Sequence, residues 1–320
     1  MRLQARVEMF DRYQRRHRWL GFPLAVRQKY SDDQGGFLAA AITYYGFFSI
    51  FPLLLVLVSV LGFVLQGHPH LQQTIVQSAL GNFPVIGHDL VIHSIKGSAL
   101  GLGIGIAGAT WAGMGVLLAA ESAMNQLWGV PLRRRPGLLR ARLHALLLLV
   151  ALGGGVLGST VLGGLATVGA GYGLAWKLGA IVLSAGLNFL LFWVAFRLLT
   201  VDDVSWRCLR GGALAAAVAY SGLQLLGGYY VGHVLRSSSN TYGTFALVIG
   251  LLSWIYLAVH VTLLAAEANV VATRRLWPRS FTQVAGQSTE ADRRALQQRA
   301  SVEERRDDET ITVSFGDDGQ

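Results

Sequence analysis

Two glutamates in this chain end the same five-residue sequence. Leu117–Glu121 and Leu263–Glu267 both read LLAAE, and a Leu-Trp pair follows each, at 127–128 and 276–277. A carboxylate at the end of a long apolar run costs up to about 2.5–3.5 kcal/mol in a membrane and usually has a partner or a task. Such a group can bind a proton, a cation or a charged headgroup. The repeated sequence therefore predicts a polar cavity lined by both glutamates.

Further polar side chains share helical spacing with the two glutamates. On the last apolar segment, four polar residues follow the three-four spacing that places side chains on one helix face, and another lies four residues after Glu121. Both glutamates could instead extend to the interface or pair with Arg274 and Arg275, and the sequence leaves both interpretations open. The predicted lining of the cavity comprises Glu121, Asn125, Glu267, His260, Tyr256, Ser253, Tyr44, Tyr45, Asn188 and Gln224.

The composition indicates a membrane protein. Hydrophobic residues make up 52% of the chain and charged residues 14%, and the mean hydropathy is +0.45, far from the soluble average. A helical span needs roughly 20 apolar residues to cross hydrocarbon about 30 Å thick. Six segments qualify, so we expect an all-α, polytopic fold with spans at 37–66, 99–124, 140–168, 175–198, 211–232 and 242–272.

The positions of lysine and arginine predict the orientation, because positively charged flanks remain in the cytoplasm. They concentrate before the first span, in the second and fourth loops and after the last span. Both termini are therefore expected in the cytoplasm. The net charge of +9 is mostly a topology signal rather than an indication of nucleic-acid binding, and the expected partners are anionic lipid headgroups. The predicted basic rim consists of Arg133, Arg134, Arg135, Arg140, Arg274 and Arg275.

Three regions follow from this pattern. Residues 1–36 form a basic segment that suits a helix in the cytoplasmic interface. Residues 37–277 form the six-helix domain, with an outer loop at 67–98. Residues 278–320 are polar and charged, which predicts a disordered tail. The histidines of the outer loop have no carboxylate or cysteine at ligand spacing, and Cys208 is the only cysteine, so no metal site and no cofactor are expected.

Glycines within the second span predict close helix packing. Gly101, Gly105 and Ala109 are four residues apart, and Gly108, Ala112 and Gly115 form a neighbouring stripe. Helices in lipid associate through such small residues, because lipid tails are as apolar as leucine.

Three stretches of the sequence resemble the YihY/BrkB family of bacterial inner-membrane proteins. They read AAITYYGFFSIFPLLLVLVSVLG, WAGMGVLLAAESAMNQLWGVP and NTYGTFALVIGLLSWIYLAVHVTLLAAEANVV. The resemblance covers residues 30–280 and implies six spans with both ends in the cytoplasm. It places the family's acidic positions at Glu121 and Glu267, and its Tyr-Gly pair at Tyr242 and Gly243. It also implies a role in envelope biogenesis, including transport of lipopolysaccharide precursors or other lipids, and a virulence-factor label.

Some members of the family carry the name ribonuclease BN, but a metal-dependent nuclease needs a dense cluster of His and Asp. Here the only close histidine pair is His68 and His70. No catalytic constellation is expected either, because Ser253 and His260 lie about 10 Å apart along one helix. The favoured hypothesis is a transporter or flippase for a lipid or amphipathic envelope precursor. The alternative is a non-transporting membrane scaffold that recruits envelope enzymes, and a homo-oligomer stays open.

Overall fold

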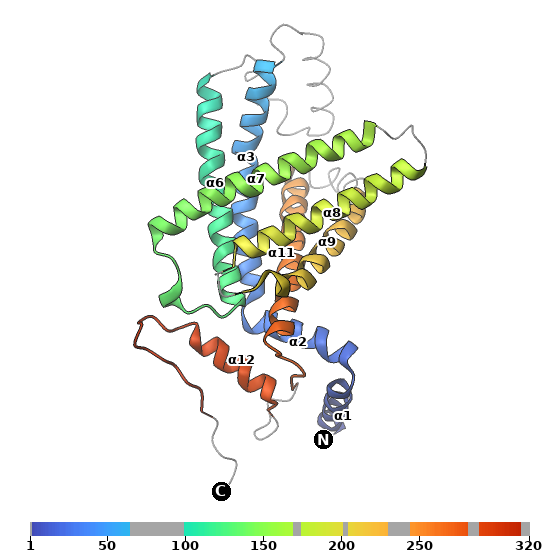
Figure 1. The fold of residues 1–320 in the computed structure, drawn as a ribbon, viewed down its shortest axis with the longest axis vertical. Helices are drawn as coiled ribbons and strands as arrows, with labels where there is room; N and C mark the ends of the chain where they lie inside the picture. The colour runs from blue at the N-terminus through green and yellow to red at the C-terminus, as the bar shows by residue number, and fades with distance from the viewer. Residues whose placement is uncertain are drawn as a thin grey trace.

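The computed structural model describes residues 2–64, 99–168, 174–200, 204–229, 244–280 and 288–314. These ranges fold into α-helices and one short 3-10 turn (Figure 1). In chain order the elements are α1 (Arg2–Arg16), α2 (Arg18–Asp32), α3 (Gly35–Val64), α6 (Ala99–Leu127), η1 (Leu132–Arg134), α7 (Leu138–Val168), α8 (Leu174–Leu198), α9 (Trp206–Tyr229), α11 (Thr244–Thr273) and α12 (Glu290–Ser301).

Each of the six predicted apolar segments falls on a long helix. Within the described ranges, four stretches are long and apolar enough to cross a membrane, namely Gly35–Val56, Ala99–Leu127, Leu138–Gly155 and Val248–Thr273. Val182–Leu198 in α8 is apolar but shorter. The chain is therefore a helical membrane protein with several spans, while the number six and the cytoplasmic location of both ends stay predictions. The outer loop at 67–98 and the pair Tyr242 and Gly243 lie outside the described residues.

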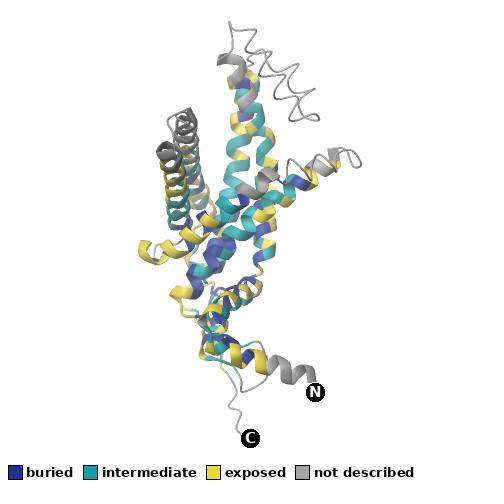
Figure 2. Cartoon of the chain, turned by 90° about the vertical axis from the view of Figure 1, so that its right-hand side faces the viewer, coloured by how far each residue is buried: buried dark blue, intermediate teal, exposed yellow. Residues whose placement is uncertain are grey.

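Helices α3 and α6 pack side by side along their length (Figures 1 and 2). The predicted glycine stripes of α6 form this contact. A Cβ atom at Gly105 would lie 3.0 Å from Cγ2 and 3.1 Å from the backbone nitrogen of Val56, and one at Gly108 would lie 3.0 Å from Cβ of Pro52. A Cβ atom at either position would be in tighter contact with α3 than nearly all real Cβ atoms, so the small-residue packing predicted for this span is confirmed.

Buried residues gather at one end of the helix bundle, the lower half of the molecule in Figure 2. Leu127 from α6, Leu209 from α9 and Val270 from α11 are fully enclosed there. Elsewhere the helices expose large apolar side chains, among them Leu147 and Val150 of α7. An apolar surface of this kind fits contact with lipid rather than water.

The predicted N-terminal helix forms as two helices, α1 and α2, and α2 packs against α11. Its location in the membrane interface stays a prediction. The stretch between α6 and η1 turns sharply, because Gly129 has a φ of +65°, which favours glycine.

The prediction of a disordered tail is wrong for residues 288–314. Helix α12 begins with a capping box in which the Thr289 side chain accepts from the Asp292 amide and Asp292 accepts from the Thr289 amide. Arg279 joins Asp292, at 3.1 Å, to Asp32 of α2, at 2.7 Å. Beyond α12, the Leu132 amide donates to the Val302 carbonyl. The low apolar content of this segment led to the prediction of disorder, whereas helix capping and ion pairs hold the segment in place.

We predict that Gly105→Val destabilises the protein more than Gly103→Val. Nothing lies within 4 Å of a Cβ at Gly103, whereas at Gly105 the added atoms would collide with α3. Overpacking of this kind costs about 1–3 kcal/mol. Thermal unfolding of both variants in detergent measures the difference, and equal melting temperatures would contradict the α3–α6 packing described above.

We predict that Asp292→Asn loosens α12 by about 1.5–3 kcal/mol, the usual value of hydrogen bonds to a charged group. Burial acts to raise the pKa of Asp292, but hydrogen bonds from Thr289, Ser280 and Arg279 outweigh burial and lower the pKa. The contribution of Asp292 is thus complete above the usual aspartate pKa of about 3.9 and is lost as the pH falls through the lowered value.

Hydrogen exchange of the α12 amides measures this effect. The exposed Asp308 offers the matched control Asp308→Asn, which should leave the exchange rates unchanged. Equal protection of α12 in both variants would show that Asp292 does not hold the tail.

Candidate functional site

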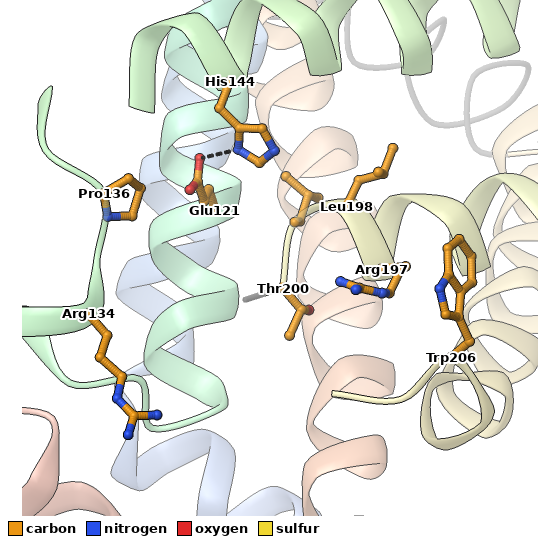
Figure 3. A pocket seen from close by; sticks show the side chains of 9 residues that line it. Glu121, Arg134, Pro136, His144, Arg197, Leu198, Thr200 and Trp206 are labelled. Atoms are coloured by element: carbon orange, nitrogen blue, oxygen red, sulfur yellow. Dashed lines mark ion pairs between the residues drawn. The ribbon is translucent and has the colours of Figure 1, made fainter. Parts of the chain in front are cut away.

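A cavity of about 330 Å³ opens where the ends of α6 and α8 approach the beginnings of α7 and α9 (Figure 3). Its position at the helix ends follows from the topology, because α6 and α8 both finish on the side where α7 and α9 begin. The cavity is lined by Glu121, Arg134, Pro136, His144, Arg197, Leu198, Leu199, Thr200 and Trp206.

Glu121 is the acidic group of this cavity, which we call the Glu121 cavity. The residue is only 7% exposed, and its Oε2 atom lies 3.6 Å from Nδ1 of His144, which faces it from α7 (Figure 3). This distance is too long for a hydrogen bond. Among the described residues Oε2 has no hydrogen-bond partner. The carboxylate therefore has acceptor capacity for a ligand that enters the cavity.

Basic and aromatic side chains form the opposite wall of the Glu121 cavity. The guanidinium carbon of Arg197 lies 5.6 Å from the ring centroid of Trp206, which is cation–π geometry. Trp193 donates from Nε1 to the Trp206 carbonyl at 2.9 Å, and Arg210 lies over the Trp193 ring. Arg134 also lines the cavity, although its side chain extends away from Glu121 in Figure 3, so two arginines and a histidine share the lining with one carboxylate. The cavity thus presents an excess of positive charge beside apolar leucine side chains.

Glu267 lies in a different environment, a buried cluster with Lys29 and Asp33. Glu267 is 0% exposed, and the ammonium nitrogen of Lys29 lies 3.8 Å from its Oε2 atom. Lys29 also pairs with Asp33 and donates to the Leu127 carbonyl at 3.1 Å. Because Leu127 ends α6, its carbonyl has no partner within the helix. Lys29 therefore connects α2, α6 and α11 at one point, while Arg274 and Arg275 are exposed.

Of the polar stripe predicted on α11, only the part toward the C-terminus of the helix faces α2. Nδ1 of His260 lies 2.7 Å from the Tyr30 hydroxyl. Burial, together with Tyr256 and Glu267, raises the pKa of Tyr30 to about 12, so the phenol keeps its proton at physiological pH. Ser253 and Tyr256 are exposed.

Tyr30 and His260 line a second cavity, of about 820 Å³, between α2, the start of α3 and α11. The two cavities share no lining residue, and Glu267 lines neither of them.

The remaining predicted lining residues are dispersed. Asn125 is buried, and its Oδ1 atom has no hydrogen-bond partner within the described ranges. Tyr44 and Tyr45 are exposed on α3, where the Tyr45 ring lies against Gly115. Asn188 is half-buried on α8, and the side chain of Gln224 lies outside the described residues. The structure thus places Glu121 and Glu267 at separate sites.

The six arginines of the predicted basic rim also lie in different environments. Arg133 pairs with Glu304 of the tail at 2.9 Å, and Arg135 donates to the Val130 carbonyl and to Gln126. Burial lowers the pKa of Arg135. Arg134 lines the Glu121 cavity. The exposed members are Arg134, Arg140, Arg274 and Arg275.

Sequence reasoning missed several residues of both sites. One signal for Lys29 is its spacing of four from Asp33, directly before the first span, which is typical of a helical ion pair. His144 is the last polar residue before the long apolar run of α7, two residues after Arg142, and this position also marks a polar contact. Arg197 lies near the end of α8 and Trp206 begins α9, and their contact forms only in the fold. The described ranges contain no group of three or more His, Cys, Asp or Glu residues that could hold a metal ion.

The comparison with known proteins shows the family of the chain. A family model described as "Virulence factor BrkB" matches residues 26–286. The chain belongs to the BrkB family. As a BrkB protein it is a multi-pass protein of the inner membrane, consistent with its long apolar helices and with the name of one relative, the inner membrane protein YhjD of Escherichia coli. YhjD is 26% identical over 283 residues, which cover 80% of this chain and 82% of YhjD.

Other relatives carry the name UPF0761 membrane protein. One from Azotobacter vinelandii is 32% identical over 273 residues, covering 79% of this chain and 64% of the relative. One from Ralstonia nicotianae is 33% identical over 180 residues, covering 54% and 39%. The chain therefore spans less than two thirds of the length of these two relatives. No solved structure matches this BrkB protein.

We predict that Lys29→Met destabilises the protein by about 3–5 kcal/mol, because removing one partner of a buried ion pair leaves uncompensated charge. The control is Arg274→Met, which removes an exposed cation at the same end of α11. Thermal unfolding in detergent compares the two variants. A melting temperature for Lys29→Met equal to that of the control would contradict the role of the buried cluster.

Proposed function

We propose that this BrkB-family protein moves an amphipathic lipid or envelope precursor with an anionic headgroup across the inner membrane. In this proposal the headgroup binds in the Glu121 cavity. The protein acts as a carrier and not as an enzyme, and its other partners are the surrounding membrane lipids.

The observation that carries the proposal is the chemistry of the Glu121 cavity. Arg134 and Arg197 supply guanidinium groups, which suit phosphate and carboxylate groups of a ligand. The Oε2 atom of Glu121 can accept from a hydroxyl or amine of the same headgroup. A cavity with both acidic and basic groups suits a headgroup that carries an anionic group together with a hydroxyl or an amine.

The surroundings of the cavity support a lipid rather than a soluble ion. Its volume, about 330 Å³, lies at the lower end of ligand pockets and suits a headgroup rather than a whole lipid. Leu198 and Leu199 line the same cavity. Trp206 adds an amphipathic ring of the kind that marks membrane interfaces. The adjoining α7 exposes Leu143 and Leu147, along which acyl chains can lie.

We predict that Glu121→Gln and Arg197→Gln each slow transport about tenfold or more. Loss of one hydrogen bond to a charged group is worth about 1.5–3 kcal/mol, and 1.4 kcal/mol corresponds to a factor of ten. The measurement is movement of fluorescent anionic and zwitterionic lipids between leaflets of vesicles that contain the purified protein, with and without a proton gradient. Arg275→Gln, which changes an exposed arginine outside the cavity, is the control.

Equal transport in wild type and both cavity variants would exclude the Glu121 cavity as the headgroup site. Absence of movement by the wild-type protein for every lipid tested would contradict a general lipid flippase. The protein would then act on a specialised precursor or as the scaffold considered above.

A further inference from the structure

The buried cluster of Lys29, Asp33 and Glu267 has a composition that the proposed transport function does not use. The three residues are 3%, 5% and 0% exposed. They come from α2, from the residue that caps α2 and from α11, more than two hundred residues away. Ionisable groups enclosed in this way cost free energy unless their charges are compensated.

The charges of this cluster do not balance. Two carboxylates approach one ammonium group, since Lys29 pairs with Asp33 and lies 3.8 Å from Glu267. The neighbouring Asp32 adds a third carboxylate, but it is partly exposed and pairs with Arg279 at 2.7 Å. If all groups are ionised, the enclosed cluster carries one uncompensated negative charge.

The hydrogen bonds of Glu267 are incomplete as well. Neither of its carboxylate oxygens has a hydrogen-bond partner among the described residues. The group that α6 presents is the Leu127 carbonyl, which is an acceptor, and the Gln298 amide of α12 donates to that same carbonyl at 3.3 Å. The Tyr30 hydroxyl is engaged with His260. Two adjacent carboxyl groups can bond to each other only when one of them carries a proton.

We propose that Asp33 and Glu267 bind one proton between them, beside the ammonium group of Lys29. The proton removes the excess charge and gives Glu267 the hydrogen bond that the described neighbours do not supply. The ligand of this site is a proton and not a metal cation, because the Lys29 ammonium already occupies the point where Asp33, Glu267 and the Leu127 carbonyl converge.

The electrostatics of Asp33 support this assignment. Burial raises the pKa of Asp33, although Lys29 and the adjacent carboxyl group of Glu267 act in the opposite direction. The nearby charge of Asp32 raises it further. Asp33 thus favours the protonated form more in the folded protein than in the unfolded chain.

A bound proton makes the joint of α2, α6 and α11 sensitive to pH. The folded protein binds the proton more tightly than the unfolded chain, so its stability falls as the pH rises from about 3.9, the usual value for aspartate, through the raised pKa. Loss of the proton leaves two carboxylates against one ammonium at the point where the three helices meet. This behaviour does not depend on the proposed transport function.

Infrared spectroscopy of the wild-type protein at neutral pH tests the proposal directly. We expect the carbonyl-stretch band of a protonated carboxyl group, and we expect the band to disappear as the pH is raised. In Glu267→Gln and in Asp33→Asn the remaining carboxylate pairs with Lys29 alone, so the band should be lost at neutral pH. The control Glu290→Gln, which changes an exposed carboxylate of α12, should keep it.

A second measurement follows the melting temperature against pH. The wild-type melting temperature should fall as the proton is released, whereas that of Glu267→Gln should be nearly independent of pH in the same range. Absence of the band in the wild type, or a band unchanged in Glu267→Gln, would overturn the proposal. A melting temperature that rises with sodium or potassium relative to choline, in the wild type but not in Glu267→Gln, would assign the site to a metal cation instead.

Discussion

The ammonium group of Lys29 is the contact on which the inner architecture depends. Lys29 is enclosed, so its charge must be compensated and its hydrogen bonds must be made within the protein. Its three partners are the side chains of Asp33 and Glu267 and the carbonyl that ends α6. The negative end of the α6 dipole adds to this attraction. Apolar surfaces give little drive for association in lipid, so a polar joint of this kind fixes how the helices meet.

The two LLAAE motifs end in different environments because their helices have different neighbours. Helix α6 brings Glu121 to the ends of α7, α8 and α9, where a cavity leaves one carboxylate oxygen without a hydrogen-bond partner within the described ranges. Helix α11 brings Glu267 against α2, where it is fully buried. The same sequence motif therefore yields one buried group that lines a cavity and one fully enclosed group that holds helices together.

The tail reinforces the end of the bundle at which both glutamates lie. Figure 1 shows α12 below the ends of α6 and α11. Gln14 donates to the Arg279 carbonyl, Gln298 donates to the Leu127 carbonyl, and Arg133 pairs with Glu304. These contacts are polar and span distant parts of the chain. They connect the tail to the carbonyl that Lys29 also binds, so the tail and the buried cluster stabilise the same joint.

The sequence by itself determined the membrane class, the six helical segments and the glycine contacts of α6, because hydrophobicity and residue size act locally along the chain. It also identified both glutamates as costly groups that need partners. Only the tertiary structure decided what those partners are. Lys29 and Glu267 are separated by most of the chain, and His144 and Glu121 lie on different helices. The order in α12 was likewise hidden, since its capping and ion pairs depend on Arg279, Asp32 and loop groups brought together by folding. The hydrophobic pattern of a sequence predicts which segments are apolar helices. Which charged residues pair depends on which helix ends meet in space.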